Sequence, residues 1–78
     1  MKVRVDVMLK TGVLDPQGAA VRRALGNMGF GGVEKVRQGK VIELELATDD
    51  PDEARAAATE MAEKLLANTV IERYEISL

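Results

Sequence analysis

Four carboxylates, at Asp49, Asp50, Asp52 and Glu53, form the densest group of side chains in this sequence that could do chemistry. Converging carboxylate oxygens bind hard cations such as Mg²⁺ or Ca²⁺. However, Asp50 directly precedes Pro51, and this pair is typical of a helix start, where the aspartate accepts hydrogen bonds from free backbone N–H groups. We therefore interpret the group as a helix cap and predict no metal site.

Residue types that usually carry catalysis are missing. The sequence has no histidine and no cysteine, so it lacks the common near-neutral acid–base group and the common zinc ligands. Gly12 and Gly18 match a phosphate-binding loop only weakly, and the negative charge of Asp15 opposes an anion there. We predict no catalytic residues and no cofactor bound by this chain.

Composition restricts the other function classes. The 78 residues suit a single domain over 1–78, and 11 basic against 13 acidic residues give a net charge of −2. No basic stripe indicates nucleic acid, and no apolar run could span a membrane, so we expect a cytoplasmic protein. A domain of this size has a marginal core, which favours self-association as a dimer or tetramer.

The segment Lys10–Gly18 lies between a predicted strand and a predicted helix. Residues 2–10 alternate apolar and polar side chains, the period of a half-buried strand. Asp15 and Pro16 then predict a helix start, and Gly29 predicts its left-handed end. The expected buried stripe of this helix is Gly18, Val21, Leu25 and Met28. Gly18 and Gly26 lower helix propensity, either because the helix approaches a neighbour closely there or through simple tolerance.

The rest of the chain predicts two further strands, a helix and a last strand. The strands cover 33–38 and 41–47, joined by a hairpin turn at Gln38-Gly39. The helix runs from Asp50 to Asn68, where a left-handed residue ends it, with a buried stripe of Ala54, Ala58, Met61 and Leu65. In the last strand, 70–78, Glu72 has inward parity. Either a bulge resets the phase there or Glu72 lies at a solvated rim.

The resulting order is β-α-β-β-α-β, which predicts an α+β, ferredoxin-like fold. Right-handed crossovers place both helices on one face of a four-stranded antiparallel sheet. The other face is mixed in character and carries Arg4, Asp6, Met8, Val41, Glu43, Glu45, Arg73 and Glu75.

Four blocks of this sequence resemble PurS, the small-subunit family of bacterial and archaeal phosphoribosylformylglycinamidine synthase. They are Gly12–Gly18, Leu25–Phe30, Val36–Lys40 and Lys64–Tyr74, and the first and last are the more specific. One departure is Thr69, where the family is expected to show proline.

The resemblance implies a bridging role without catalysis in a three-component ligase. The partners would be a PurL-like synthetase subunit, which uses ATP and magnesium, and a PurQ-like glutaminase subunit, which releases ammonia from glutamine. The small subunit would associate with itself, hold the other two together and support ammonia transfer. We place partner contacts on Lys10, Gly12, Val13, Leu14, Gln17 and Arg37, because apolar loop residues either meet a partner or plug the end of the core.

Two alternatives belong to other function classes. A stand-alone, dimeric ferredoxin-like regulatory module would bind a small effector, and a thermal-shift screen with amino acids and nucleotides would reveal it. RNA binding on the open sheet face is disfavoured, because the strands lack aromatic residues for base stacking and carry Glu43, Glu45 and Glu75.

Overall fold

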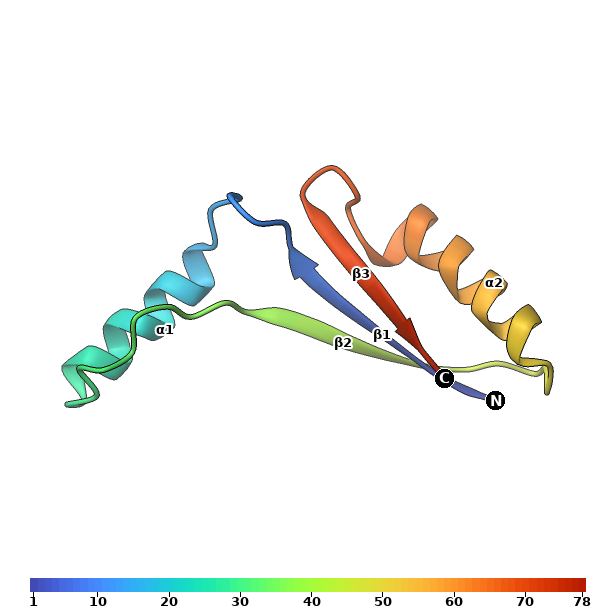
Figure 1. The fold of residues 1–78 in the computed structure, drawn as a ribbon, viewed down its shortest axis with the longest axis horizontal. Helices are drawn as coiled ribbons and strands as arrows, with labels where there is room; N and C mark the ends of the chain where they lie inside the picture. Colours follow the sequence, from blue (N-terminus) through green and yellow to red (C-terminus); the bar gives the residue numbers. More distant parts are fainter.

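The computed structural model describes residues 1–78 as a three-stranded antiparallel sheet with two helices (Figure 1). The elements in chain order are β1 (Lys2–Leu9), α1 (Pro16–Asn27), β2 (Gly39–Glu45), α2 (Pro51–Met61) and β3 (Glu72–Ser77). A π-helical turn, Ala62–Leu66, directly extends α2. None of the helices is long and apolar enough to cross a bilayer. The predicted α+β class is confirmed.

The central strand β1 organises the sheet, whose order is β2-β1-β3. Val5 lies opposite Ile42 on one side and Ile76 on the other, so these side chains share one face. Val3, Val5 and Val7 on that face are 0%, 0% and 1% exposed. The alternation read from residues 2–10 therefore predicted both the strand and its buried face correctly.

Helix α2 packs on this face through alanines. Ala54, Ala58 and Ala62 are fully buried, which lets the helix lie close to the valines of β1. The π-helical turn then shifts the helical phase, so that the buried row continues at Ala67. The predicted stripe was right at Ala54 and Ala58. It was wrong at Met61 and Leu65, which are 39% and 83% exposed on the neighbouring side of the helix.

The predicted fourth strand is absent from this chain. Residues 33–38 are extended but belong to no ladder, and the backbone of residues 34–37 makes no hydrogen bond. The predicted hairpin at Gln38-Gly39 is also wrong, because the chain continues from this segment directly into β2 (Figure 1). The prediction failed because residues 33–38 have the composition of a strand but no neighbouring strand to pair with.

Only one helix covers the sheet, so the prediction of two helices on one face is wrong for the single chain. Helix α1 and residues 30–38, together called the arm, project from one end of the sheet (Figure 1). The radius of gyration is 15.9 Å, whereas a compact chain of this length has about 11.5 Å. Within α1 only Gly18 is buried, while Val21 and Met28 of its predicted stripe are 40% and 71% exposed.

The predicted helix caps are mostly confirmed. Asp15 and Asp50 accept bonds from the backbone N–H groups of Gly18 and Asp52, and each precedes a proline. At the end of α1, Gly29 has a φ of 97°, a left-handed conformation that glycine adopts without steric cost. The prediction of a left-handed Asn68 was wrong. The π-helical turn ends at Ala67, which is extended, and no residue other than glycine has a positive φ.

Glu72 lies at a rim, as one of the two alternatives predicted. The β1–β3 register runs without a bulge from Arg4 opposite Ser77 to Leu9 opposite Glu72. The Glu72 carboxylate accepts a hydrogen bond of 2.7 Å from the backbone N–H of Asn68. The Glu72 side chain, on the inward-facing side of β3, therefore stabilises the turn that precedes this strand.

The two glycines inside α1 provide a matched test of the packing between α1 and the extended segment that contains Val36. A Cβ at Gly18 would lie 2.5 Å from the carbonyl oxygen of Val36 and 2.7 Å from Oδ2 of Asp15, whereas a Cβ at Gly26 would meet nothing. We expect Gly18→Ala to destabilise the protein by about 1–3 kcal/mol through overpacking, and Gly26→Ala to stabilise it by up to about 1 kcal/mol through helix propensity. Urea unfolding measures both, and equal effects would contradict this packing.

Candidate functional site

The loop between β1 and α1 is held by backbone hydrogen bonds at its base. The N–H of Lys10 donates to the carbonyl of Ile71 at 2.8 Å, and the N–H of Val13 donates to the carbonyl of Lys10 at 3.1 Å. Gly12 has a φ of 89°, so the tight turn requires a residue without a Cβ. The side chain of Leu14, 80% exposed, is presented to solvent from this turn.

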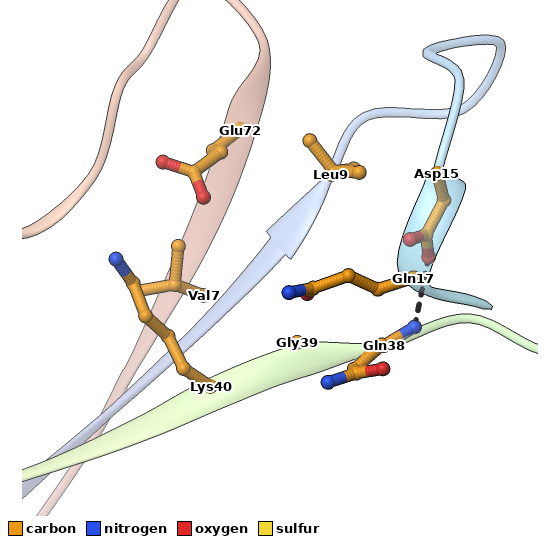
Figure 2. A pocket seen from close by; sticks show the side chains of 8 residues that line it. All are labelled: Val7, Leu9, Asp15, Gln17, Gln38, Gly39, Lys40 and Glu72. Atoms are coloured by element: carbon orange, nitrogen blue, oxygen red, sulfur yellow. Dashed lines mark hydrogen bonds between the residues drawn. The ribbon is translucent and has the colours of Figure 1, made fainter. Parts of the chain in front are cut away.

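Asp15 fastens the arm at the point where it leaves the sheet. One carboxylate oxygen accepts from the N–H of Gly18 and the other from the N–H of Gln38, each at 2.9 Å (Figure 2). These two bonds, the one from Gln38 first, lower the pKa of Asp15 below its ordinary value, and the nearby charge of Arg37 adds to the effect. A single side chain thus caps α1 and links its start to the extended segment that leads into β2.

A second tie lies beside the first. The Arg37 guanidinium donates to the backbone carbonyl of Leu9, the last residue of β1. The extended segment that leads into β2 is therefore fixed to both the end of β1 and the start of α1. Because neighbouring side chains on an extended segment alternate, Lys35 and Arg37 lie on the same side of it.

These ties enclose a hollow of about 380 Å³, called here the loop hollow. Three cations and one carboxylate surround it, so its local charge is positive and it is bordered by the apolar residues of the loop. Its lining consists of Lys10, Thr11, Gly12, Val13, Leu14, Asp15, Lys35, Val36 and Arg37.

A second hollow, of about 270 Å³, lies where the strands end, and Figure 2 shows its lining. The Gln17 side chain extends into it from α1, with Lys40 and Glu72 contributed by β2 and β3. Gln38 and Gly39 complete its wall on the side of the returning segment. The hollow is thus lined by polar groups from β2, β3 and the start of the arm, while β1 contributes the apolar side chains of Val7 and Leu9.

The structure brings five of the six predicted contact residues together. Lys10, Gly12, Val13, Leu14 and Arg37 line the loop hollow, whereas Gln17 faces the other hollow.

Of the two roles considered for the apolar loop residues, Leu14 does not plug the core, and Val13 is half-buried. Sequence reasoning missed Lys35, although its two-residue spacing from Arg37 was a signal for a shared side. It also missed Asp15 as a tie to Gln38, because no local pattern indicates a bond across 23 positions.

The acidic residues around position 50 cap α2. Thr48 accepts a bond from the N–H of Asp50 and donates its hydroxyl to Glu53, and Asp50 in turn caps the helix at Asp52. No group of three potential metal ligands converges in the structure. The helix-cap interpretation made from the sequence therefore agrees with the geometry.

An apolar groove, called here the helix groove, runs between α2 and β2. Its volume is about 490 Å³, and it is lined by Leu44, Ala57, Glu60, Met61, Lys64, Leu65 and Leu66. The Glu60–Lys64 ion pair, at 2.6 Å, lies on its rim. The groove lies over the part of the sheet face that α2 does not cover.

Taken together, the fold and the site define an α+β protein with a surface loop held by hydrogen bonds, a projecting helical arm and an uncovered apolar groove. Comparison with known proteins makes the identification specific. Residues 2–78 match the family model described as PurS, phosphoribosylformylglycinamidine (FGAM) synthase. The chain belongs to this family.

Individual relatives and solved structures agree. The phosphoribosylformylglycinamidine synthase subunit PurS of Bacillus subtilis is 53% identical over 77 residues, which cover 96% of this chain and 90% of the relative. The crystal structure of Methanocaldococcus jannaschii PurS has a TM-score of 0.88 at 39% identity, covering 97% of this chain and 92% of that one.

A third structure places a similar chain in a larger assembly. A chain in the structure of PurLQS from Thermotoga maritima has a TM-score of 0.88 at 34% identity, covering 97% of this chain and 93% of that one. The likeness extends over the arm as well as the sheet, because these alignments include nearly the whole chain.

Titration of Asp15 provides a test of the tie between arm and sheet. Because its pKa is lowered from the ordinary value of 3.8, the stability it contributes is complete above that value and is lost as pH falls through the lower native pKa. We expect Asp15→Asn to destabilise the protein at pH 7, and this difference from the wild type to shrink as the pH is lowered below 3.8.

Urea unfolding across this pH range measures the effect. Asp49→Asn is the matched control, since the Asp49 carboxylate makes no hydrogen bond in the structure, and it should leave stability nearly unchanged. A constant difference between Asp15→Asn and the wild type at every pH would contradict the assignment.

Proposed function

We propose that this chain is the bridging subunit of a phosphoribosylformylglycinamidine synthase complex in purine biosynthesis. Its partners are a synthetase subunit that uses ATP and magnesium and a glutaminase subunit that hydrolyses glutamine. The observation that carries the proposal is the full-length match to the PurS family, together with the likeness to a chain in the PurLQS assembly.

The chemistry of such a complex explains why a bridging chain is needed. Ammonia released at one subunit must reach an activated amide on another, and in bulk water at neutral pH it is mostly the non-nucleophilic ammonium ion. A subunit that holds the two active sites in register shortens this path without any reacting group of its own. We infer that the catalytic groups and their cofactors reside on the partner chains.

We place the contact with these partners at the loop hollow. Leu14 supplies an exposed apolar anchor, and Lys10, Lys35 and Arg37 surround it with positive charge. A binding interface needs an aromatic or aliphatic anchor that fills a pocket and is held on a rigid support, and the loop is fixed here by Asp15 and its backbone bonds. The complementary partner surface would be an apolar pocket with acidic residues at its rim.

Self-association is part of the same proposal. The chain exposes 5626 Å², about 1,000 Å² more than the roughly 4,650 Å² of an average folded monomer of its mass. A typical stable interface buries about 800 Å² on each partner. The excess surface is therefore of the size that one additional interface between copies would remove.

The contact proposal predicts a selective loss of coupling. In the reconstituted three-component complex, replacing Val13 and Leu14 by serine should weaken assembly about tenfold or more, equivalent to roughly 1.4 kcal/mol. Glutamine-dependent amidine formation should fall with it, whereas ammonia-dependent formation by the synthetase subunit should persist. Steady-state assays with each nitrogen source measure the two activities.

The matched control is Val41→Ser. It removes an apolar side chain, 53% accessible, from the sheet face opposite the one that α2 covers. It should leave the glutamine-dependent activity close to that of the wild type. If the Val13 and Leu14 variant folds normally and couples glutamine hydrolysis as well as the wild type, the loop is not the contact surface.

A further inference from the structure

A second loop lies beside the loop between β1 and α1. It comprises residues 67–71, between the π-helical turn and β3, and is called here the Asn68 loop. Because β1 and β3 are antiparallel, the end of β1 and the start of β3 meet at one end of the sheet, where both loops lie (Figure 1). The hydrogen bond of 2.8 Å from the N–H of Lys10 to the carbonyl of Ile71 joins the two loops directly.

The Asn68 loop is held by its own hydrogen bonds. The Asn68 carbonyl accepts from the N–H of Ile71 at 3.0 Å and from that of Glu72 at 2.7 Å. The side-chain oxygen of Asn68 accepts from the N–H of Val70 at 3.2 Å, and the N–H of Asn68 donates to the Glu72 carboxylate. Every backbone N–H from 68 to 72 except that of Thr69 is therefore bonded within the loop.

This ordered loop presents apolar side chains to solvent. Val70 is 80% exposed and Ile71 is 39% exposed, and residues 65–71 carry no charge. Single apolar residues on a surface are ordinary, but Leu14 on the neighbouring loop is exposed to the same 80%. Two apolar side chains on adjacent, hydrogen-bonded loops are the arrangement that anchors a binding partner.

The two anchors are close enough for one partner segment to reach both. The N–H of Val13 closes a turn on the carbonyl of Lys10, so the path from Leu14 to Val70 runs through one turn and one hydrogen-bonded pair of residues. Standard spacings along this path place the Cα atoms of Leu14 and Val70 at most about 20 Å apart. An extended segment of about six residues spans that distance.

Charge indicates what this segment carries. The carboxylates that flank the two loops, Asp15 and Glu72, both accept hydrogen bonds from backbone N–H groups. Lys10 lies on the path between the anchors, and its side chain makes no ion pair. A carboxylate on the bound segment would complement this charge, whereas the same surface of a second copy would bring like charges together.

We propose that the Asn68 loop and the loop between β1 and α1 form one binding surface for a single acidic and apolar segment of a partner subunit. Val70 and Leu14 are its two apolar anchors, and Lys10 between them pairs with a carboxylate of the segment. The hydrogen bond between Lys10 and Ile71 keeps the anchors at a fixed separation. This deepens the partner contact proposed above and rests on it, adding an anchor from a distant part of the sequence.

The absence of natural cysteines allows each anchor to be labelled alone. Leu14→Cys and Val70→Cys are each coupled to a benzophenone maleimide, assembled with the synthetase and glutaminase subunits and irradiated, and mass spectrometry identifies the linked peptides. Both positions are exposed, so neither label displaces a buried side chain. We expect both to link to one contiguous partner segment that contains acidic residues. The control label at Val41→Cys, on the open sheet face, should not reach that segment.

A second measurement tests the anchor without a label. Val70→Ser should weaken assembly of the three-component complex about tenfold, because it removes an apolar side chain from the contact. The matched control is Thr69→Ala, which shortens an exposed neighbour whose side chain makes no hydrogen bond, and it should leave assembly unchanged. Urea unfolding of both variants verifies that each is folded.

Three results would overturn the shared surface. One is normal assembly of a folded Val70→Ser variant while replacement of Val13 and Leu14 weakens the complex, which would leave the proposed function standing. Another is cross-linking from position 70 to nothing but a second copy of this chain. The third is cross-linking of positions 14 and 70 to different partner subunits. Failure of the wild-type chain to assemble with either subunit would refute the proposed function and, with it, this inference.

Discussion

The close packing of valine on alanine between β1 and α2 is the interaction on which the rest of the structure depends. Val3, Val5 and Val7 meet Ala54, Ala58 and Ala62, all at 1% exposure or less. Because alanine has so short a side chain, the helix lies near the sheet but buries little area per residue. This row holds the three strands and one helix together, and it leaves the arm to be stabilised by other means.

What remains outside this core is the part of the chain in which the function is proposed to lie. Asp15 and Arg37 fix the loop, the start of α1 and the returning segment to the ends of the strands. The same contacts that present Leu14 to solvent also hold the arm away from its own sheet. Both features suit the bridging and self-association proposed above, since one surface would meet unlike partners and another a second copy.

The local elements were largely predictable from the sequence. Alternation in residues 2–10 determined β1 and its buried face, and the Asp-Pro pairs at Asp15 and Asp50 located both helix starts. These features depend on neighbours within a few positions. The end of α2 was not predicted correctly. The π-helical turn at 62–66 changes the helical phase, and no glycine or proline marks it in the sequence.

The long-range arrangement was harder to predict from the sequence. The pattern indicated a helix and a strand for the arm but could not tell whether they pack on the same chain, since a buried face has the same sequence in either case. For the same reason, the apolar character of Met61 and Leu65 predicted burial that the single chain does not provide. The loop hollow was partly foreseen through family resemblance, whereas Lys35 and the tie from Asp15 to Gln38 depend on contacts between distant segments.

The central claim is that this chain becomes a complete fold only together with a second copy, and the protein-concentration dependence of unfolding tests it most directly. If folding and association are coupled, the urea midpoint should rise with concentration, with about 1.4 kcal/mol of added stability for each tenfold increase. A midpoint that stops falling once the protein is diluted below the dissociation constant, with the chain still folded, would show that the single chain is stable alone. That result would contradict the account.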